Sequence, residues 1–359
     1  MIIMRTQLMG LILTIMSAIR INALPVKEFA RLEDMSGRFQ ALSFTEAYSV
    51  IWGSPSISSL EPDHGDAVHL KLDKTSGSGF VSLENYMYGF YSTSIKFPVQ
   101  DYAAGIVLAF YTSNGDEFPS NHDELDFEFL GNIKGRPWRM QTNVYGNGSV
   151  AHGREERFDF WFNPTADYHN YSILWNQHHI VFMVDSIPIR EMIRSEPLEG
   201  DYPSKPMGMY ATLWDGSAWA TDGGRFKVDY KYAPFIASFK SLKMQGCAAN
   251  PFLQNLEKEN TRPLASSMGC TSLETDNSVN PLEAEFLSLS PQQEAAMAWV
   301  RSTYMYYSYC DDKSRYPTPL PECTSRVAAS SRVLRSRKQR TKRANYRSFN
   351  LTSARESGF

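Results

Sequence analysis

Acidic and apolar residues alternate through the segment 122–131, which reads HDELDFEFLG. If this segment is a strand, Glu124, Asp126 and Glu128 point to one face, because side chains alternate between the two faces of a strand. The leucine and phenylalanines between them then point to the opposite face. The spacing therefore predicts three carboxyl groups on one surface, backed by an apolar surface that can pack into a core.

Three carboxylates on one face allow more than one interpretation. They could be the acidic solvent face of a half-buried strand, but like charges about 7 Å apart repel and acidic residues are depleted in strands. A calcium-binding loop is disfavoured by the interleaved large apolar residues and by the absence of a mid-loop glycine. A chemical function therefore explains the row of acids better than a solvent-exposed face or a calcium-binding loop does.

Glycoside hydrolysis is a chemistry that uses such acids. A retaining enzyme needs one carboxylate as nucleophile and one protonated carboxyl as acid, with their heads about 5 to 5.5 Å apart. Residues i and i+4 of a flat strand are about 13 Å apart at Cα, so a concave sheet would have to lean the heads inward. The acid between them would raise a neighbour's pKa by charge repulsion and could share a proton with the nucleophile.

Strands are the elements that must position these acids. From residue 24 to 245, short runs rich in aromatic and β-branched residues alternate with Gly, Pro, Asn and Asp, which is typical of an all-β domain. The expected strands are 67–72, 89–97, 105–111, 125–130, 171–175, 180–184 and 226–230. Because helices do not alternate with them, we expect a curved antiparallel two-sheet jelly-roll sandwich.

The pattern changes after the strand-rich region. Ser290, Pro291 and Gln293 have the spacing of an N-cap, a first-turn proline and a capping-box partner, which predicts one helix over 290–304. Residues 248–289 are polar with little periodicity, and we expect an irregular loop there.

All four cysteines, Cys247, Cys270, Cys310 and Cys323, lie in the last third of the chain. Four cysteines allow three pairings, of which Cys247 with Cys270 and Cys310 with Cys323 closes the shortest loops. A zinc site is disfavoured, because no CxxC pair or histidine has ligand spacing. We therefore expect a C-terminal extension tied by two disulfides.

The N-terminus is typical of a secretory signal peptide. Arg5 precedes an apolar run at 8–19, and Ala23 offers a small residue for cleavage, although Arg20 also leaves an uncleaved anchor open. No later segment is apolar enough to span a membrane. The expected division is a signal peptide at 1–23, a jelly-roll catalytic domain at 24–245, the extension at 246–323 and a basic, disordered tail at 324–359.

Charge is distributed unevenly along the 359 residues. Residues 324–359 hold ten Lys and Arg against one acid, a balance of +9, which leaves 26 basic against 38 acidic residues elsewhere, or −12. An acidic body argues against nucleic-acid binding, which needs positive charge on the folded domain. The tail is either a solvated segment or an electrostatic tether to acidic wall polysaccharide.

The 122–131 segment resembles the active-site signature of the plant xyloglucan endotransglucosylase/hydrolases, in the glycoside hydrolase group that includes the lichenases. The resemblance continues in the segments 74–80, 88–111, 140–148 (MQTNVYGNG), 162–176, 213–221 (LWDGSAWAT), 232–235 and 307–317 (YSYCDDKSRYP). It implies that Glu124 is the nucleophile, that Asp126 assists it and that Glu128 is the acid/base. It implies no cofactor and no metal.

The resemblance also implies a long polysaccharide cleft. Its substrate-binding residues would be Gln141, Asn143, Glu155, Trp214, Trp219 and Arg315. Core packing is the alternative for the two tryptophans, because sandwiches bury aromatics freely. Ala218 and Asp222 depart from the residues of many relatives, so acceptor preference stays open.

One further departure concerns glycosylation. Many relatives have a sequon directly after the catalytic strand, whereas Asn132 is here followed by Ile133 and Lys134. Among the remaining sequons, at Asn147, Asn170 and Asn350, Asn147 is the favoured acceptor.

The resulting interpretation is a secreted cell-wall enzyme of the apoplast. It would cleave the β-1,4-glucan backbone of xyloglucan with retention and transfer it to another xyloglucan chain or oligosaccharide acceptor. Hydrolysis of xyloglucan or mixed-linkage glucan, or glycan binding without catalysis, are the alternatives.

Overall fold

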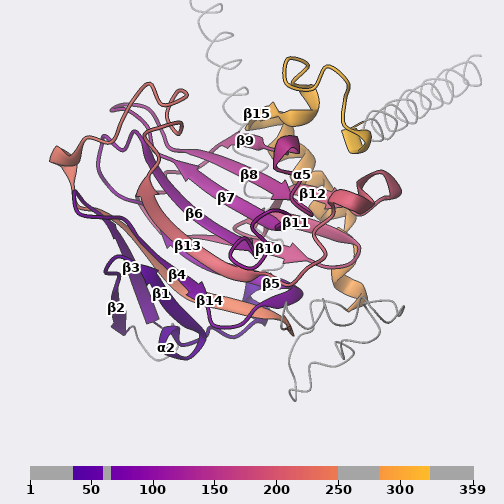
Figure 1. Cartoon of the computed structure of the whole chain (residues 1–359), viewed down its shortest axis with the longest axis horizontal. Coiled ribbons are helices and arrows are strands. Elements are labelled where there is room, and N and C mark those ends of the chain that lie inside the picture. The colour runs from indigo at the N-terminus through magenta and orange to yellow at the C-terminus, as the bar shows by residue number, and fades with distance from the viewer. Residues whose placement is uncertain (1–34, 60–65, 250–282, 324–359) are drawn as a thin grey trace, which may run out of the picture.

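Two antiparallel sheets face each other in the computed structural model, which describes residues 35–59, 66–249 and 283–323 (Figure 1). The eight-stranded sheet has the order β1 (Tyr48–Trp52), β4 (Ser78–Ser82), β13 (Gly208–Asp215), β6 (Ile106–Ser113), β7 (Glu124–Leu130), β8 (Arg139–Tyr145), β9 (Glu156–Asp159) and β15 (Met305–Ser308). The seven-stranded sheet has the order β12 (Ile187–Ile193), β11 (His179–Val184), β10 (His169–Trp175), β5 (Tyr86–Lys96), β14 (Phe235–Ala248), β3 (Asp66–Leu72) and β2 (Ser56–Ser59). The predicted all-β two-sheet sandwich is confirmed.

The core lies between the sheets and is rich in aromatic rings. Phe127 on β7 meets Tyr171 on β10 and Phe182 on β11 edge to face, with ring centroids 5.7 and 5.2 Å apart. Phe129, two residues further along β7, stacks beside Phe127 and is fully buried. Full burial of each such ring stabilises the fold by about 1.5–3 kcal/mol. This apolar face of β7 fixes which way its acidic face points.

Helices are few. Among the described residues, the α-helices are α2 (Phe44–Ala47) and α5 (Pro291–Thr303), and the 3₁₀ turns are η1 (Met35–Arg38), η2 (Val150–His152), η3 (Glu196–Asp201), η4 (Tyr230–Tyr232), η5 (Ala284–Phe286) and η6 (Tyr309–Asp311). The predicted capping box of α5 is present, since the Ser290 side chain accepts from Gln293 N and the Gln293 side chain accepts from Ser290 N. The α5 helix buries Ala296 and Val300 and packs on β12. Within the described ranges, no helix is both long and apolar enough to cross a bilayer.

One expected strand, 226–230, is wrong. Phe226 forms only an isolated bridge with Thr221, and the 3₁₀ turn η4 begins at Tyr230. The backbone between them bonds to side chains of neighbouring loops: Val228 N donates to Ser217 Oγ, and Tyr102 Oη donates to Lys227 O. These bonds satisfy the backbone outside a sheet ladder.

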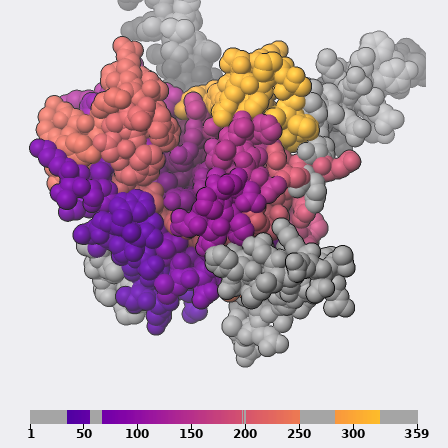
Figure 2. All heavy atoms as spheres, in the orientation of Figure 1, coloured from indigo at the N-terminus to yellow at the C-terminus, as the bar shows by residue number. Residues whose placement is uncertain are grey.

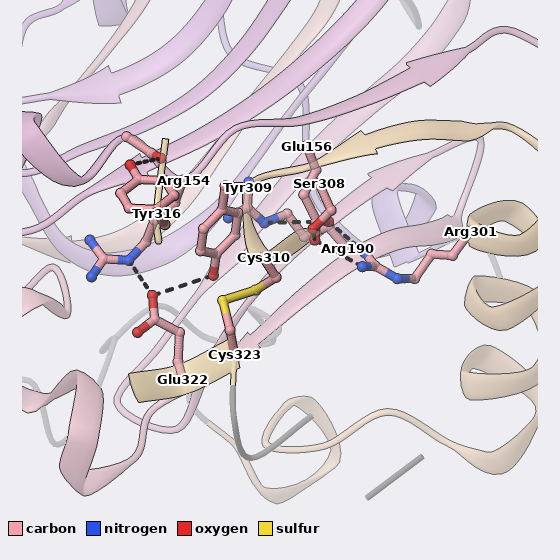
Figure 3. The surroundings of a disulfide bond; sticks show 11 residues. Arg154, Glu156, Arg190, Arg301, Ser308, Tyr309, Cys310, Tyr316, Glu322 and Cys323 are labelled. Atoms are coloured by element: carbon pink, nitrogen blue, oxygen red, sulfur yellow. Dashed lines mark hydrogen bonds and ion pairs between the residues drawn. A yellow bond between two sulfur atoms is a disulfide. The ribbon is translucent and has the colours of Figure 1, made fainter. Parts of the chain in front are cut away.

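The C-terminal extension is joined to the eight-stranded sheet through β15, which pairs with β9. Two buried networks hold it there (Figure 3). Arg301 of α5 forms a bidentate pair with Glu156 of β9 at 2.5 and 2.8 Å. Arg154 donates to Glu322 at 2.6 Å beside the Cys310–Cys323 disulfide. These contacts fix β15 at the sheet edge.

The Cys310–Cys323 disulfide was predicted and is confirmed. The predicted disulfide between Cys247 and Cys270 stays a prediction, because Cys270 lies outside the described residues. The predicted signal peptide and the basic tail at 324–359 lie outside them too.

Candidate active site

The three acids of β7 line one cleft of about 580 Å³ on the eight-stranded sheet. The cleft lining comprises Trp52, Ala109, Tyr111, Glu124, Asp126, Glu128, Asn143, Tyr145, Thr212 and Trp214. The loop between β13 and β14, in salmon, and the C-terminal extension, in yellow, stand at the rim of this face (Figure 2). Phe127 and Phe129 point into the core, so the alternation read from the sequence describes the actual faces of β7.

Cross-strand register sets the surroundings of each acid. Asp126 lies opposite Tyr111 of β6 and Asn143 of β8. Glu128 lies opposite Gln141 of β8, whose Nε2 donates to Glu128 Oε2 at 2.5 Å. Glu124 and Asp126 therefore have hydroxyl or amide neighbours from both adjoining strands, whereas Glu128 has Gln141 on β8 and only Ala109 on β6.

Burial dominates the electrostatics of the acids. It raises the pKa of Glu128 to about 7, while the hydrogen bond from Gln141 and the charge of Arg157 work in the opposite direction. The pKa of Asp126 lies well above its usual value, because the group is buried and flanked by Glu124 and Glu128. Burial also raises the pKa of Glu124, against hydrogen bonds with Ser113 and Asp126. The raised pKa of Asp126 favours its protonated form, which can share a proton with Glu124.

A polar network continues from Glu128 toward β15. Arg157 of β9 donates from Nε to Gln141 Oε1 at 2.7 Å, and its guanidinium lies over the Tyr307 ring of β15. Arg315 forms an ion pair with Glu155 at 2.5 Å. The two predicted residues Glu155 and Arg315 therefore meet each other on this side of the cleft.

Tryptophan side chains lie on the side of the cleft opposite β9 and β15. Trp214 on β13 lines the cleft and contacts Trp219 with ring centroids 6.2 Å apart. Trp219 is 37% exposed, and Trp214 packs on a separate small cluster with Val107 and Leu130. Neither ring therefore belongs to the main core between the sheets. Trp52 at the end of β1 also lines the cleft, and its ring covers Gly79, where a Cβ atom would come within 2.9 Å of it.

The sequence did not predict three residues of the lining, Trp52, Tyr111 and Tyr145, or Arg157 beside it. They lie on strands other than β7, and sheet order and register bring them near the acids. No local pattern marks Trp52, because the glycine that its ring covers, Gly79, lies on β4.

Asn147 lies away from the cleft in the turn after β8. It is exposed, with φ of 52°, and is followed by Gly148 with φ of 75°. Asn132, in contrast, is buried, and its amide donates to Pro137 O. Across the described residues, no group of three or more His, Cys, Asp or Glu could hold a metal ion.

The chain's class follows from this sandwich and its acid-lined cleft together with sequence matches. Residues 44–232 match the family described as glycosyl hydrolases family 16, and residues 276–323 match the xyloglucan endo-transglycosylase C-terminus. Among solved structures, the Bacillus licheniformis β-glucanase is 21% identical, covering 58% of this chain and 95% of its own, with a TM-score of 0.44.

Curated relatives define the family more closely. The Arabidopsis thaliana protein named "Probable xyloglucan endotransglucosylase/hydrolase protein 30" is 48% identical, covering 88% of this chain and 84% of the relative. Xyloglucan endotransglucosylase/hydrolase protein 31 of the same plant is 40% identical, covering 80% and 90%. The chain belongs to the xyloglucan endotransglucosylase/hydrolase family of glycosyl hydrolases family 16.

Proposed function

We propose that this enzyme cleaves the β-1,4-glucan backbone of xyloglucan with retention and transfers it to another xyloglucan chain or oligosaccharide. The observation that carries the proposal is the placement of Glu124, Asp126 and Glu128 in one cleft, with burial raising the pKa of Glu128 to about 7. A group with that pKa can both give and take a proton near neutral pH. Family membership supports the choice of polymer.

In the first half-reaction, Glu124 attacks the anomeric carbon of the donor and Glu128 protonates the leaving glycosidic oxygen. The C–O bond breaks, the shortened chain leaves with that proton, and the glucan stays attached to Glu124 as an ester. Asp126 holds its own proton toward Glu124 and so orients the nucleophile.

In the second half-reaction, Glu128, now ionised, removes a proton from the acceptor hydroxyl, and the acceptor oxygen displaces Glu124. Two displacements at one carbon restore its configuration. The row Gln141, Arg157 and Tyr307, on neighbouring strands, supports an acceptor sugar bound beside Glu128. A sugar held there excludes water and favours transfer over hydrolysis.

A product assay separates transfer from hydrolysis. The protein is incubated with xyloglucan polymer and labelled xyloglucan oligosaccharides, and the products are sized. Label appearing in the polymer is the expected result. Free label with shortening chains would identify a hydrolase, and turnover of mixed-linkage glucan alone would identify a different glucanase.

A variant tests catalysis against glycan binding alone. Glu124→Ala removes the nucleophile, so we expect turnover to be lost while xyloglucan binding, measured by calorimetry, stays within about threefold of the wild type. Gln177→Ala, an exposed position outside the cleft lining, serves as the control. Unchanged turnover in Glu124→Ala would contradict the assignment.

The same proposal includes the site of action. Secretion into the apoplast rests on the signal-peptide pattern at 1–23 and on the xyloglucan substrate. Glycosylation at Asn147 is supported by its exposure and its sequon. The basic tail would tether the enzyme to acidic wall polysaccharide, and pectate binding that is insensitive to salt or to deletion of 324–359 would refute this tether.

A further inference from the structure

A second groove lies at one end of the sandwich. It has a volume of about 710 Å³ and shares no lining residue with the catalytic cleft. Its walls come from the β5–β6, β7–β8 and β9–β10 connections, with residues 99–103, 132–138 and 160–165 taking part, and from Tyr304 before β15. These connections lie at the same end of the two sheets. We call this feature the end groove.

Backbone hydrogen bonds hold the end groove open. Ala103 N donates to Asn132 O at 2.9 Å, which joins the first two connections. Phe97 N donates to Pro164 O at 3.0 Å, which joins the third connection to the end of β5. Gly131 belongs to the same junction, because a Cβ atom there would collide with the carbonyl of Ala103. The groove is therefore preformed, as ligand sites usually are.

Partly exposed aromatic rings form much of its surface. Trp161 contacts two other rings of the lining, with its ring 5.3 Å from Phe162 at an interplanar angle of 88° and 5.5 Å from Tyr304. Phe160 and the buried Trp138 support this cluster from the core side. Rings with fixed, partly exposed faces match the apolar faces of sugar rings.

Polar groups stand among the rings. The groove is lined by Gln100, Asn163 and Arg136, and the buried Oε1 of Gln100 has no hydrogen-bond partner. Gln100 is held in place because its Nε2 donates to Pro234 O at 2.7 Å. Asp101 and Arg136 are the two charged residues of the lining and have opposite signs. Gln100 Oε1 is enclosed and its Nε2 is already bonded, so Asn163 and Arg136 are the polar groups that the lining offers, without net charge.

We propose that the end groove is a second, non-catalytic binding site for a neutral glucan chain. Sugar hydroxyls can use its amide and guanidinium groups, and sugar faces can stack on Trp161. Its balanced charge disfavours a polyanion. Naming xyloglucan as the bound polymer rests on the proposed function. A polymer held at the end groove raises the effective concentration of its other segments at the catalytic cleft, whereas a short oligosaccharide gains nothing.

Kinetics on long and short donors test this proposal. Trp161→Ala should raise KM for xyloglucan polymer by about three- to tenfold, with kcat unchanged and with KM for an oligosaccharide donor unchanged. Arg136→Ala, whose side chain is 56% exposed, should act in the same direction without touching the aromatic cluster. If Trp161→Ala fails to fold, the KM of Arg136→Ala for xyloglucan polymer tests the proposal instead.

Lys134→Ala is the matched control, because Lys134 is a cation of the same connection outside the groove lining, and its loss removes only a 3.8 Å ion pair with Asp101 in which both side chains are largely exposed. A KM for polymer that is unchanged in both groove variants, or that rises equally for both donors, would overturn the proposal.

Direct binding separates this proposal from the proposed function. Affinity electrophoresis in gels containing xyloglucan, mixed-linkage glucan or polygalacturonate is run on Glu124→Ala protein with and without Trp161→Ala. Retardation by a neutral glucan that depends on Trp161 supports the end groove, even if the wild type does not turn over xyloglucan. Turnover of xyloglucan without such retardation would contradict glucan binding at the end groove and would leave the proposed function unaffected.

Discussion

At the scale of single residues, burial raises the pKa of all three carboxyls of β7, and their neighbours differ. The pKa of Asp126 is raised further by the charges of Glu124 and Glu128, whereas that of Glu128 is about 7 because Gln141 and Arg157 partly offset its burial. In the proposed mechanism, the same residue type thus serves as nucleophile at one position of β7 and as acid at another.

The pH dependence of the first half-reaction follows from Glu128. In the proposed mechanism this group acts as the acid and must be protonated, and its protonated fraction falls as pH rises through about 7, so kcat/KM for the donor should fall above that pH. Gln141→Ala removes a hydrogen bond that favours the carboxylate form. The alkaline limb should therefore move to higher pH, together with a lower maximal rate.

The measurement is a pH profile of kcat/KM on a donor oligosaccharide. Arg157→Ala should move the limb in the same direction, because it removes a nearby positive charge. A limb that stays in place or moves to lower pH in both variants would show that another group controls it.

At the scale of elements, the C-terminal extension completes the eight-stranded sheet. β15 brings Tyr307 beside Arg157, and α5 packs on β12 of the other sheet. The pair of Arg301 with the buried Glu156 joins α5 to β9, the strand that also carries Arg157. The extension therefore borders the network that leads from Glu128 to β15.

Breaking the ion pair between Arg301 and Glu156 should destabilise the fold. Arg301→Ala leaves the fully buried Glu156 with Arg190 at 3.8 Å and the Ser308 hydroxyl but without its bidentate partner, and we expect the free energy of unfolding to fall by about 1.5–3 kcal/mol. Chemical denaturation measures this change. Arg38→Ala breaks the exposed Arg38–Glu285 pair as a control and should cost about 0–1 kcal/mol. Equal losses in the two variants would contradict the structural role given to Glu156.

At the scale of the whole molecule, the seven-stranded sheet packs on the apolar face of β7, opposite the face that carries the acids. Phe182 on β11 packs edge to face on Phe127, directly behind the acids. The position of the carboxyl heads therefore depends on how closely the two sheets pack.

A cavity behind the acids tests this dependence. Phe182→Ala should destabilise the fold by about 3–5 kcal/mol and also lower kcat, because β7 loses its packing support. Phe90→Ala makes a cavity in the separate cluster on the other side of the seven-stranded sheet and should leave kcat closer to the wild type. Stability and kcat are measured on both variants, and an equal kcat would argue that sheet packing does not position the acids.

The sequence predicted much of this protein from local patterns. The alternation in 122–131 gave the face shared by the acids, aromatic and β-branched runs gave most strands, and Ser290 with Gln293 gave the start of α5. Local patterns failed at 226–230, where loop side chains such as Ser217 take the backbone hydrogen bonds.

Strand alternation and helix caps are properties of neighbouring residues, so the sequence by itself determined that Glu124, Asp126 and Glu128 share a face. Only the tertiary structure decided that Trp52 and Tyr111 join them, that Glu155 meets Arg315, and that an end groove exists. The physical reason is that register and sheet packing bring together residues far apart in the chain, and burial in that assembly sets the pKa of each acid.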